Sequence, residues 1–403
     1  MTNKNIVCGI DVHKEFLIGT ILGEGDNKKV ERYETDHESI LKFRDWLREN
    51  RCERAVIEST GVYWVPVFLA LEGVVDIVVA NAYQVKQIPG RKTDESDSEW
   101  LAKLLRGNLI RPSYIPERNI RDLRDLTRLR TKLVHVRTDF KNRVHKVLER
   151  ANIRLSAVLS DLFGKTGLQI LKGITSGKSL DEVIGGIKNK RIDKKEVEEA
   201  IKGNLSESDV FLLEYCVKMV EILGSEIAEI ENKIEERIKG MEKELKIVMS
   251  VVGVGKTAAQ EILAEVGDIK RFPEDKNLAS WAGLAPSVYQ SGGKNLTGRT
   301  RKGSKWLRKT MFQVAMAASR NKKSELREFY LRIKAKKGHK VAIVALARKI
   351  LCIIHHLLTT GECYTEEGIS KKPIKLKSHE TKDFEIKRAI RILHKAGYTI
   401  SQG

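Results

Sequence analysis

The first quarter of the chain alternates short apolar runs with polar turns. Such runs are typical of strands, and apolar residues at steps of three and four are typical of amphipathic helices. On these patterns we expect strands over residues 5–10, 16–22, 28–35, 54–59 and 74–81, and helices over residues 37–49, 61–72 and 93–105. Strands that alternate with helices indicate an α/β layer fold.

The middle of the chain has a different pattern, with apolar residues at the spacing of a heptad. They recur over residues 126–140 and again over residues 216–234. This predicts two long helices that pack antiparallel to each other or against another molecule. The polar residues 166–208 between them predict short helices or loops.

These changes of pattern divide the chain of 403 residues, which is long for a single core, into four parts. We expect an α/β domain over 1–115 and a helical coiled-coil region for oligomerisation over 116–246. A mainly α-helical domain, punctuated by glycines, follows over 247–365. A charged extension ends the chain over 366–403.

Composition narrows the class of protein. The five cysteines are scattered without the spacing of metal ligands, which fits a reducing cytoplasm and argues against a disulfide framework or a zinc ribbon. The N-terminus lacks the features of a signal peptide, and no run of ~18 apolar residues indicates a membrane helix. We therefore expect a cytoplasmic protein with no membrane partner.

Charge points to a polyanionic partner. Lysine and arginine number 74 against 54 acids, a formal net charge of +20. The excess is segregated, because residues 276–324 contain no Asp or Glu at all, whereas an ordinary soluble surface mixes its signs. A basic segment of this kind predicts contact with the phosphates of nucleic acid.

Four carboxylates fall at the ends of expected elements in the first domain. Asp11 follows the first strand and Glu58 comes at the end of the fourth. Asp94 and Asp97 lie three residues apart at the start of a helix, on one face. Acids at strand ends of an α/β sheet gather at one edge, where Mg²⁺ would find oxygen ligands and room for substrate phosphates. Singly, each acid is equally well explained as a turn or helix-start residue.

The residues around these acids carry a resemblance. The segments "GIDVHK", "IESTGVYW" and "KTDESD" resemble the start of the insertion-sequence transposases of the 110/1111 family. The resemblance implies a RuvC-like, ribonuclease-H-type domain whose DEDD acids fall on Asp11, Glu58, Asp94 and Asp97. From its place in the sequence we also expect Lys92 to lie close to these acids and to contact nucleic acid. An actin-like sugar kinase also opens with a strand and Gly-x-Asp, but it needs glycine-rich phosphate loops that this half does not show.

A glycine-rich stretch near residue 250 has two interpretations. "SVVGVGKTAA" ends like a nucleotide-binding P-loop, but Ser250 stands where that motif needs its first glycine. The alternative is a helix-hairpin-helix, in which the turn offers backbone N–H groups and Lys256 to DNA phosphates. We favour the second, because a long charged helix rather than an apolar strand precedes the stretch.

A basic, glycine-rich loop is expected from residue 290 up to a helix that we expect over residues 305–319. Ser291 stands at its head, before two glycines that let a ligand approach the backbone closely. Serine is a weak nucleophile without an activating group, and no histidine lies in this segment, so the residues alone favour a turn serine. The cations expected to contact phosphates are Lys294, Arg299, Arg301, Lys302, Lys305 and Arg308.

The same family is identified again in this half. "MSVVGVGKTAAQEILAEVGDIKRF", "LASWAGLAP" and "QSGG" followed by "GRTRKGS" resemble the second domain of the 110/1111 transposases. The resemblance implies a DNA recombinase in which Ser291 forms a phosphoserine link and the four acids bind Mg²⁺. It also implies a bridge RNA that pairs with donor and target DNA. One departure is Gly303-Ser304, where the family usually has Gly-Asn or Gly-Asp.

The acids and the serine are far apart in the chain, with expected long helices between them. We therefore expect them to meet between subunits of a homodimer or homotetramer, in a protein associated with a prokaryotic nucleoid. Two alternatives stay open. The chain could be a RuvC-like junction nuclease in which the acids activate water and Ser291 is a loop residue. It could also bind nucleic acid without catalysis.

Overall fold

The computed structural model describes residues 6–23, 25, 27–59, 61–89, 96–189, 192–291, 294–300 and 302–365, with backbone alone over 287–291 and 294–299. The chain divides into two compact units, one ending at Pro116 and the other beginning at Glu117. Each unit has hydrophobic cores of its own.

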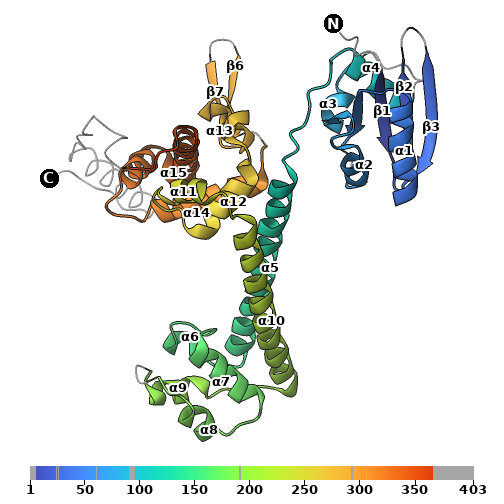
Figure 1. Cartoon of the computed structure of the whole chain (residues 1–403). Coiled ribbons are helices and arrows are strands. Elements are labelled where there is room, and N and C mark those ends of the chain that lie inside the picture. Colours follow the sequence, from blue (N-terminus) through green and yellow to red (C-terminus); the bar gives the residue numbers. More distant parts are fainter. Residues whose placement is uncertain are drawn as a thin grey trace, which may run out of the picture. The chain divides into compact units, whose positions relative to one another are not determined.

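A five-stranded mixed sheet forms the centre of the first unit (Figure 1). Its strands are β1 (Val7–Val12), β2 (Phe16–Leu22), β3 (Lys28–Glu34), β4 (Arg54–Glu58) and β5 (Asp76–Ala80), in the spatial order β3-β2-β1-β4-β5. β1 pairs antiparallel with β2 and parallel with β4, with Ile10 beside Ile57. The carboxyl ends of β1 and β4 therefore meet at one edge, and the predicted α/β character is confirmed.

Helices cover both faces of this sheet. They are α1 (His37–Glu49), α2 (Trp64–Leu71), α3 (Ala82–Lys86) and α4 (Asp97–Arg106). The helices α1 and α2 bury Phe43 and Leu71 against one face. Val85 of α3 and Leu101 of α4 pack with Val56 on the other. Of the helix expected over 93–105, residues 93–95 lie outside the described residues.

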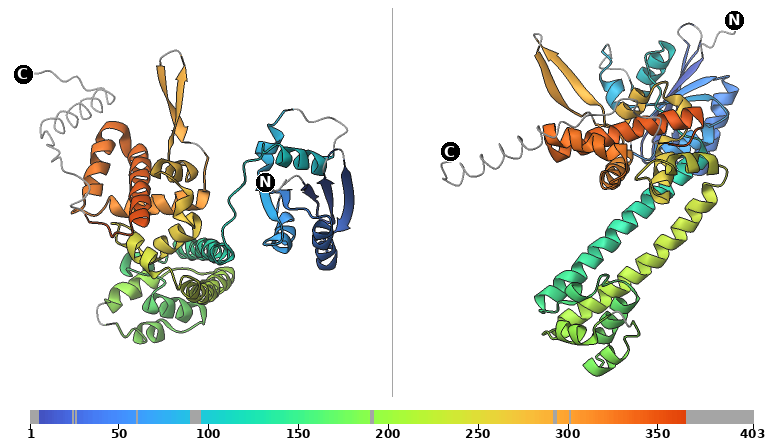
Figure 2. Two further views of the ribbon diagram at one scale, coloured as in Figure 1. Left: turned by 45° about the horizontal axis from the view of Figure 1, so that its top comes forward. Right: turned by 90° about the vertical axis from the view of Figure 1, so that its left-hand side faces the viewer.

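Two long helices that lie side by side open the second unit (Figures 1 and 2). They are α5 (Arg118–Arg150) and α10 (Glu207–Arg237). Ion pairs join Arg130 to Glu231 and Arg150 to Asp209, so the numbering rises along one helix as it falls along the other. The expected pair of long antiparallel helices is therefore present.

Short helices connect α5 to α10, as the polar segment predicted. They are α6 (Leu155–Val158), α7 (Lys165–Thr175), α8 (Leu180–Gly185) and α9 (Lys194–Ile201). Leu148 of α5 and Leu213 of α10 are buried with Ile170 and Val197 of this group. The connection is thus a small helical bundle with its own core at one end of the long pair (Figure 1).

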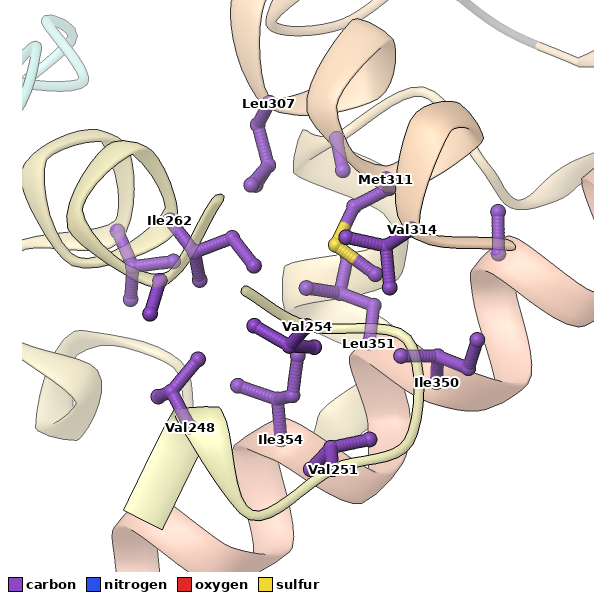
Figure 3. Packing of buried hydrophobic residues seen from close by; sticks show 14 of the residues in the cluster. Val248, Val251, Val254, Ile262, Leu307, Met311, Val314, Ile350, Leu351 and Ile354 are labelled. Carbon is purple, nitrogen blue, oxygen red and sulfur yellow. The ribbon is translucent and has the colours of Figure 1, made fainter. Parts of the chain in front are cut away.

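The remaining helices surround the largest core of the second unit. They are α11 (Glu242–Met249), α12 (Lys256–Val266), the 3₁₀ turn η1 (Ile269–Arg271), α13 (Asp275–Trp281), α14 (Lys305–Ala318) and α15 (Glu325–Thr360). Figure 3 shows Ile262, Met311 and Ile354 meeting in this core. By length and composition α15 could cross a membrane, but its Leu346, Ile350 and Ile354 are fully buried in the core.

A β-hairpin stands where the sequence predicted a loop. β6 (Pro286–Ser291) and β7 (Lys294–Thr300) pair antiparallel, with Ser291 opposite Lys294. The expectation of a loop from residue 290 to residue 304 was wrong for this part. Glycines suggest a loop, but a Gly-Gly pair also suits the two-residue connection of a hairpin. The valine, tyrosine and threonine residues on either side favour strands.

Candidate active site

Three carboxylates of the first unit line a single cavity of about 400 Å³. Asp11 lies near the end of β1, Glu58 ends β4 and Asp97 begins α4. Alternate residues of a strand point to opposite faces. Asp11 shares its face with Val7, and Glu58 shares its face with Val56, which both pack toward α4. The structure thus brings three of the four expected acids together, while Asp94 and Lys92 lie outside the described residues.

Gly9 allows α4 to approach the sheet closely enough to bring Asp97 to this cavity. A Cβ atom at this position would lie 2.0 Å from the carbonyl oxygen of Ser98 and 2.5 Å from the backbone nitrogen of Ala102. Any side chain here would push the helix away from β1. Gly9 is therefore part of the support of the site, which the sequence analysis missed although this glycine stands two residues before Asp11.

A buried hydrogen bond fixes the start of α4 along the sheet. The hydroxyls of Thr20 on β2 and Ser98 are 2.8 Å apart, and both residues are almost completely buried. Ser96 caps the helix, because its side chain accepts a hydrogen bond from the backbone N–H of Glu99. Asp97 lies between these two anchored serines, so its backbone position is determined by the fold.

The cavity is electrostatically unfavourable for a further negative charge. Burial raises the pKa of Asp11 above its ordinary value, and the carboxylates of Asp97 and Glu58 raise it further. The imidazole of His13, whose Nε2 lies 3.1 Å from Asp11 Oδ2, acts in the opposite direction. A cation bound among these acids would relieve the repulsion.

The donor set fits a hard divalent cation. In the part of the chain that the structure describes, no three His, Cys, Asp or Glu side chains gather closely enough to hold an ion by themselves. Mg²⁺ does not need such a cage, because it keeps several waters and is bound through one or two carboxylates together with substrate phosphates. The carboxylates of Asp11, Glu58 and Asp97 around one open cavity are suited to that role.

Two further residues at this cavity were not singled out from the sequence. Lys86, at the end of α3, and Trp100 on α4 are among its lining residues. A cation and an aromatic ring beside acidic groups are suited to the phosphate and the base of a nucleic acid. Lys86 ends a five-residue helix, so its place at the cavity follows from tertiary packing that periodicity does not reveal.

Ser291 occupies the end of β6 in the second unit. The register of the hairpin places it opposite Lys294, and Arg299 lies further along β7. The backbone of these three residues is described but their side chains are not, and Arg301 lies outside the described residues. Their roles in catalysis and phosphate binding stay predictions.

Arg308 anchors the base of this hairpin. Its guanidinium donates hydrogen bonds to the carbonyl oxygen of Gly283 and, over 2.9 Å, to the hydroxyl of Thr300. Gly303 passes so close to Gly283 that a Cβ atom would lie 2.2 Å from the Gly283 backbone nitrogen. Gly303 is therefore tightly packed against Gly283, and Arg308 has a structural task besides its predicted phosphate contact.

A buried acid joins the start of α14 to the long helix α5. Glu265 accepts two hydrogen bonds from Arg128 of α5, at 2.7 and 3.0 Å. The hydroxyl of Ser304 donates to the same carboxylate at 3.3 Å and also caps α14 by accepting from the N–H of Leu307. The transposases that this segment resembles usually have asparagine or aspartate at the position of Ser304. Serine caps a helix as well as those residues do, so Ser304 keeps the cap and adds no acid beside Glu265.

The other predicted phosphate contacts have mixed surroundings. Lys302 and Lys305 are exposed, and Lys305 Nζ lies 5.8 Å from the centre of the Trp306 ring. Lys256 begins α12 and forms a 2.6 Å ion pair with Glu235. The glycine turn before it packs on α14, because a Cβ atom at Gly253 would lie 2.7 Å from the backbone nitrogen of Ala318.

Comparisons with known proteins agree on both halves of the chain. Residues 8–153 match a transposase family model for the DEDD domain of IS110-type proteins. Residues 245–331 match a second model, described as transposase IS116/IS110/IS902 family. Together the two matches cover more than half of the chain.

Curated relatives give the same result. A probable family 20 transposase of Pseudomonas aeruginosa is 24% identical over 334 residues, which cover 80% of this chain and 89% of that protein. The transposase for insertion sequence element IS1111A of Coxiella burnetii is 34% identical over 161 residues, 36% of this chain and 44% of that protein. A pilin gene-inverting protein of Moraxella bovis is 32% identical over 117 residues, 28% of this chain and 36% of that protein.

These matches determine the general activity. Transposases cut and join DNA, and a DEDD transposase domain suggests the use of a divalent metal. The three described acids around one cavity and the serine on its hairpin both fall within the matched regions. The chain belongs to the IS116/IS110/IS902 family of transposases.

Proposed function

We propose that this protein is a site-specific DNA recombinase that cuts and rejoins donor and target DNA through a phosphoserine intermediate. The observation that carries the proposal is the cavity lined by Asp11, Glu58 and Asp97 in a chain that also contains the Ser291 hairpin. We assign residues 1–115 to a RuvC-like catalytic domain and residues 247–365 to the serine-containing transposase domain, with a helix-hairpin-helix at α11 and α12.

The acids would supply the metal site of the reaction. Asp11, Glu58, Asp94 and Asp97 would hold Mg²⁺, which when bound neutralises charge on a scissile phosphate and makes its phosphorus more electrophilic. Burial and close packing around Gly9 keep the carboxylates in place before substrate arrives. Lys86 lies where it can contact a neighbouring phosphate.

Ser291 would act as the nucleophile. Its oxygen bonds to phosphorus as its proton passes to solvent, and the bond from phosphorus to the leaving sugar oxygen breaks. That oxygen takes up a proton, so the number of phosphoester bonds is unchanged and the energy for rejoining is kept. The positive charge of Arg and Lys residues over 294–309 stabilises the phosphorane.

The partners would be two DNA molecules, a bridge RNA and further copies of this chain. The net charge of +20 supports binding of more than one nucleic acid. Leu129 and Val136, one heptad apart on α5, keep 45% and 42% of their surface exposed, which supports a coiled-coil contact between subunits over 116–246. Sedimentation of the protein with DNA and RNA should show a dimer or tetramer. In the cell, the protein would act in the cytoplasm, at the nucleoid of a prokaryote.

The test uses purified protein, Mg²⁺, RNA from the flank of the element, and duplexes labelled on both sides of the cut. A denaturing protein gel should show a labelled protein–DNA adduct for the wild type, and none for Ser291→Ala or Asp11→Ala. Ser287→Ala, in the same strand, and Glu15→Gln, an exposed carboxylate near Asp11, are the matched controls and should form the adduct.

Two other outcomes would contradict the proposal. Cut DNA that persists in Ser291→Ala without any adduct would indicate a RuvC-like nuclease that uses water. Binding without cleavage under all conditions would indicate a nucleic-acid-binding protein that has lost catalysis.

A further inference from the structure

A large groove lies between the base of the hairpin and α15. Its volume is about 1000 Å³, and its lining is mainly apolar, with Leu284, Val341 and Val344 among the residues that form it. Pro286 and Thr300, which begin β6 and end β7, form one lip. The groove therefore adjoins the strands that lead to Ser291.

A break in α15 shapes this groove. Gly338 has φ 81° and ψ 170°, so the two halves of the helix meet at a kink. Phe329 on the first half and Val341 on the second both line the groove. The kink is held by a 2.8 Å hydrogen bond between the Tyr330 hydroxyl and Nδ1 of His339. Lys337 and Lys340 line the groove on the two sides of Gly338.

The charged groups of the groove are cations. Lys337, Lys340, Arg348 and Lys349 are among its described lining residues, none of which is acidic. Arg332 and Lys349 both contact the ring of Phe329, at 5.5 and 4.6 Å from its centre. Burial lowers the pKa of Lys349 and the positive charge of Arg332 lowers it further, whereas the carboxylate of Glu325 acts in the opposite direction. A bound anion would relieve this repulsion between cations.

The thiol of Cys352, which also lines the groove, is neutral. Burial raises its pKa to about 12, and the adjacent carboxylate of Asp275, which is not among the lining residues, raises it further, so the thiol carries no charge near neutral pH. Val341, 48% exposed, offers an apolar surface to a ligand. An apolar floor with an aromatic wall suits nucleobases, and a cationic border suits the phosphates between them.

We propose that this groove binds an unpaired segment of the DNA strand next to the site of cutting. The bases of a duplex are stacked on one another, so only an unpaired strand can place a base against Phe329 and a phosphate beside Lys340. The choice of DNA rests on the proposed function, because the lip of the groove is the base of the hairpin that carries the nucleophile. The volume is sufficient for more than one nucleotide.

Binding of fluorescent (dT)₁₂ to the full-length chain tests this inference without Mg²⁺ and without RNA. Phe329→Leu keeps the apolar bulk and removes the ring, and should weaken binding about ten-fold. The double variant Lys337→Ala/Lys340→Ala should reduce the slope of log affinity against log salt by about 1.4, the value for two phosphate contacts on a single strand. Val341→Glu, at an exposed position, should weaken binding similarly by repelling phosphate.

The matched control is the double variant Lys322→Ala/Lys323→Ala, which removes two neighbouring exposed lysines that are not among the residues lining the groove. Its salt slope should fall by less than that of the groove variant. The inference would be overturned if the groove double variant and the control double variant had equal salt slopes. It would also be overturned if Phe329→Leu and Val341→Glu both left the affinity for (dT)₁₂ unchanged. Binding of (rU)₁₂ that is tighter than (dT)₁₂ binding and equally sensitive to Phe329→Leu would overturn it as well, because the occupant would then be RNA.

The failure of this inference and the failure of the proposed function are distinguishable. Ser291→Ala should bind (dT)₁₂ as the wild type does, since the groove does not include the serine. If the wild type forms the adduct but the groove variants bind (dT)₁₂ as tightly as the wild type does, the groove proposal fails and the recombinase proposal stands. If the groove variants bind (dT)₁₂ more weakly but the wild type forms no adduct, the recombinase proposal fails and the groove proposal stands.

Discussion

The acid cavity and the serine hairpin are built in opposite ways. The acids stand at the edge of a buried sheet, where Gly9 leaves no room for a side chain and the Thr20–Ser98 bond holds α4. Ser291 stands at the end of a two-stranded ribbon that Arg308 anchors at its base. A two-stranded hairpin has little stability of its own.

The difference fits the two chemical tasks that we propose for these sites. Metal ligands must be held within about 0.5 Å of the productive geometry, which calls for a rigid support. A nucleophile that attacks a phosphate of a bound DNA strand has to follow its substrate, and a ribbon anchored at one end can do so. The comparison predicts that substitutions around the acids act through the fold, whereas substitutions at the base of the hairpin act mainly on the rate.

The largest effect is expected from Asp11→Asn. Loss of this proposed metal ligand should lower adduct formation about 1000-fold, as removal of a preorganised electrostatic group does in other enzymes. A carboxyl whose pKa is raised in the folded state lowers stability once the pH exceeds that pKa. Without metal, the first unit of Asp11→Asn should therefore be more stable near neutral pH than the first unit of the wild type. This account of the cavity would be contradicted if Asp11→Asn stayed fully active. It would also be contradicted if the substitution destabilised the first unit in the absence of metal.

Gly9→Ala should be next, with a loss of about 3 kcal/mol of stability from overpacking. The added methyl group collides with the backbone of Ser98 and Ala102. Hydrogen-exchange mass spectrometry should show faster exchange in the first unit only. Gly23→Ala is the control, because its Cβ atom meets its nearest neighbour at an ordinary 3.4 Å. Equal exchange in the two variants would mean that the close approach of α4 is not needed.

Thr20→Val should cost about 1.5 kcal/mol, because it removes a buried hydrogen bond at nearly constant volume. Adduct formation should fall along with stability, since the start of α4 carries Asp97. Thr20→Ser keeps the hydroxyl and should restore the activity in a rate assay. If Thr20→Val lowered stability and left the rate unchanged, Asp97 would not depend on this bond.

Arg308→Lys should have the smallest effect on the fold and a visible effect on the reaction. One ammonium group cannot replace the two hydrogen bonds to Gly283 and Thr300. We expect a change in stability of less than about 1 kcal/mol and a roughly 10-fold lower rate of adduct formation from misplacement of the serine. Lys302→Arg keeps the charge at an exposed position and serves as the control. A large loss of stability would mean that the hairpin belongs to the core.

Local patterns in the sequence were sufficient for much of the first unit. The apolar runs predicted β1, β2, β4 and β5, and the expected helix over 37–49 is α1. Asp11 and Glu58 could be singled out as candidates because strand ends can be recognised from such runs. Periodicity also revealed α5 and α10, since long amphipathic helices repeat their signal many times.

Other features depend on contacts between distant residues, which local patterns do not contain. The close packing of Gly9 against Ser98 joins residues far apart in the chain. Lys86 reaches the acid cavity only through the packing of α3. The hairpin was missed because Gly292, Gly293 and Gly298 suggested a loop, although strand-forming residues surround them in the sequence.

The boundary after Pro116 has a genetic consequence. Because each unit keeps its own hydrophobic cores, a lesion in one need not unfold the other. Two defective genes, one encoding Asp11→Asn and the other Ser291→Ala, could then complement each other in the same cell if the two halves act from different chains. Insertion elements with one damaged half could be maintained by such pairing, and exchange of gene segments at this boundary could assemble new combinations.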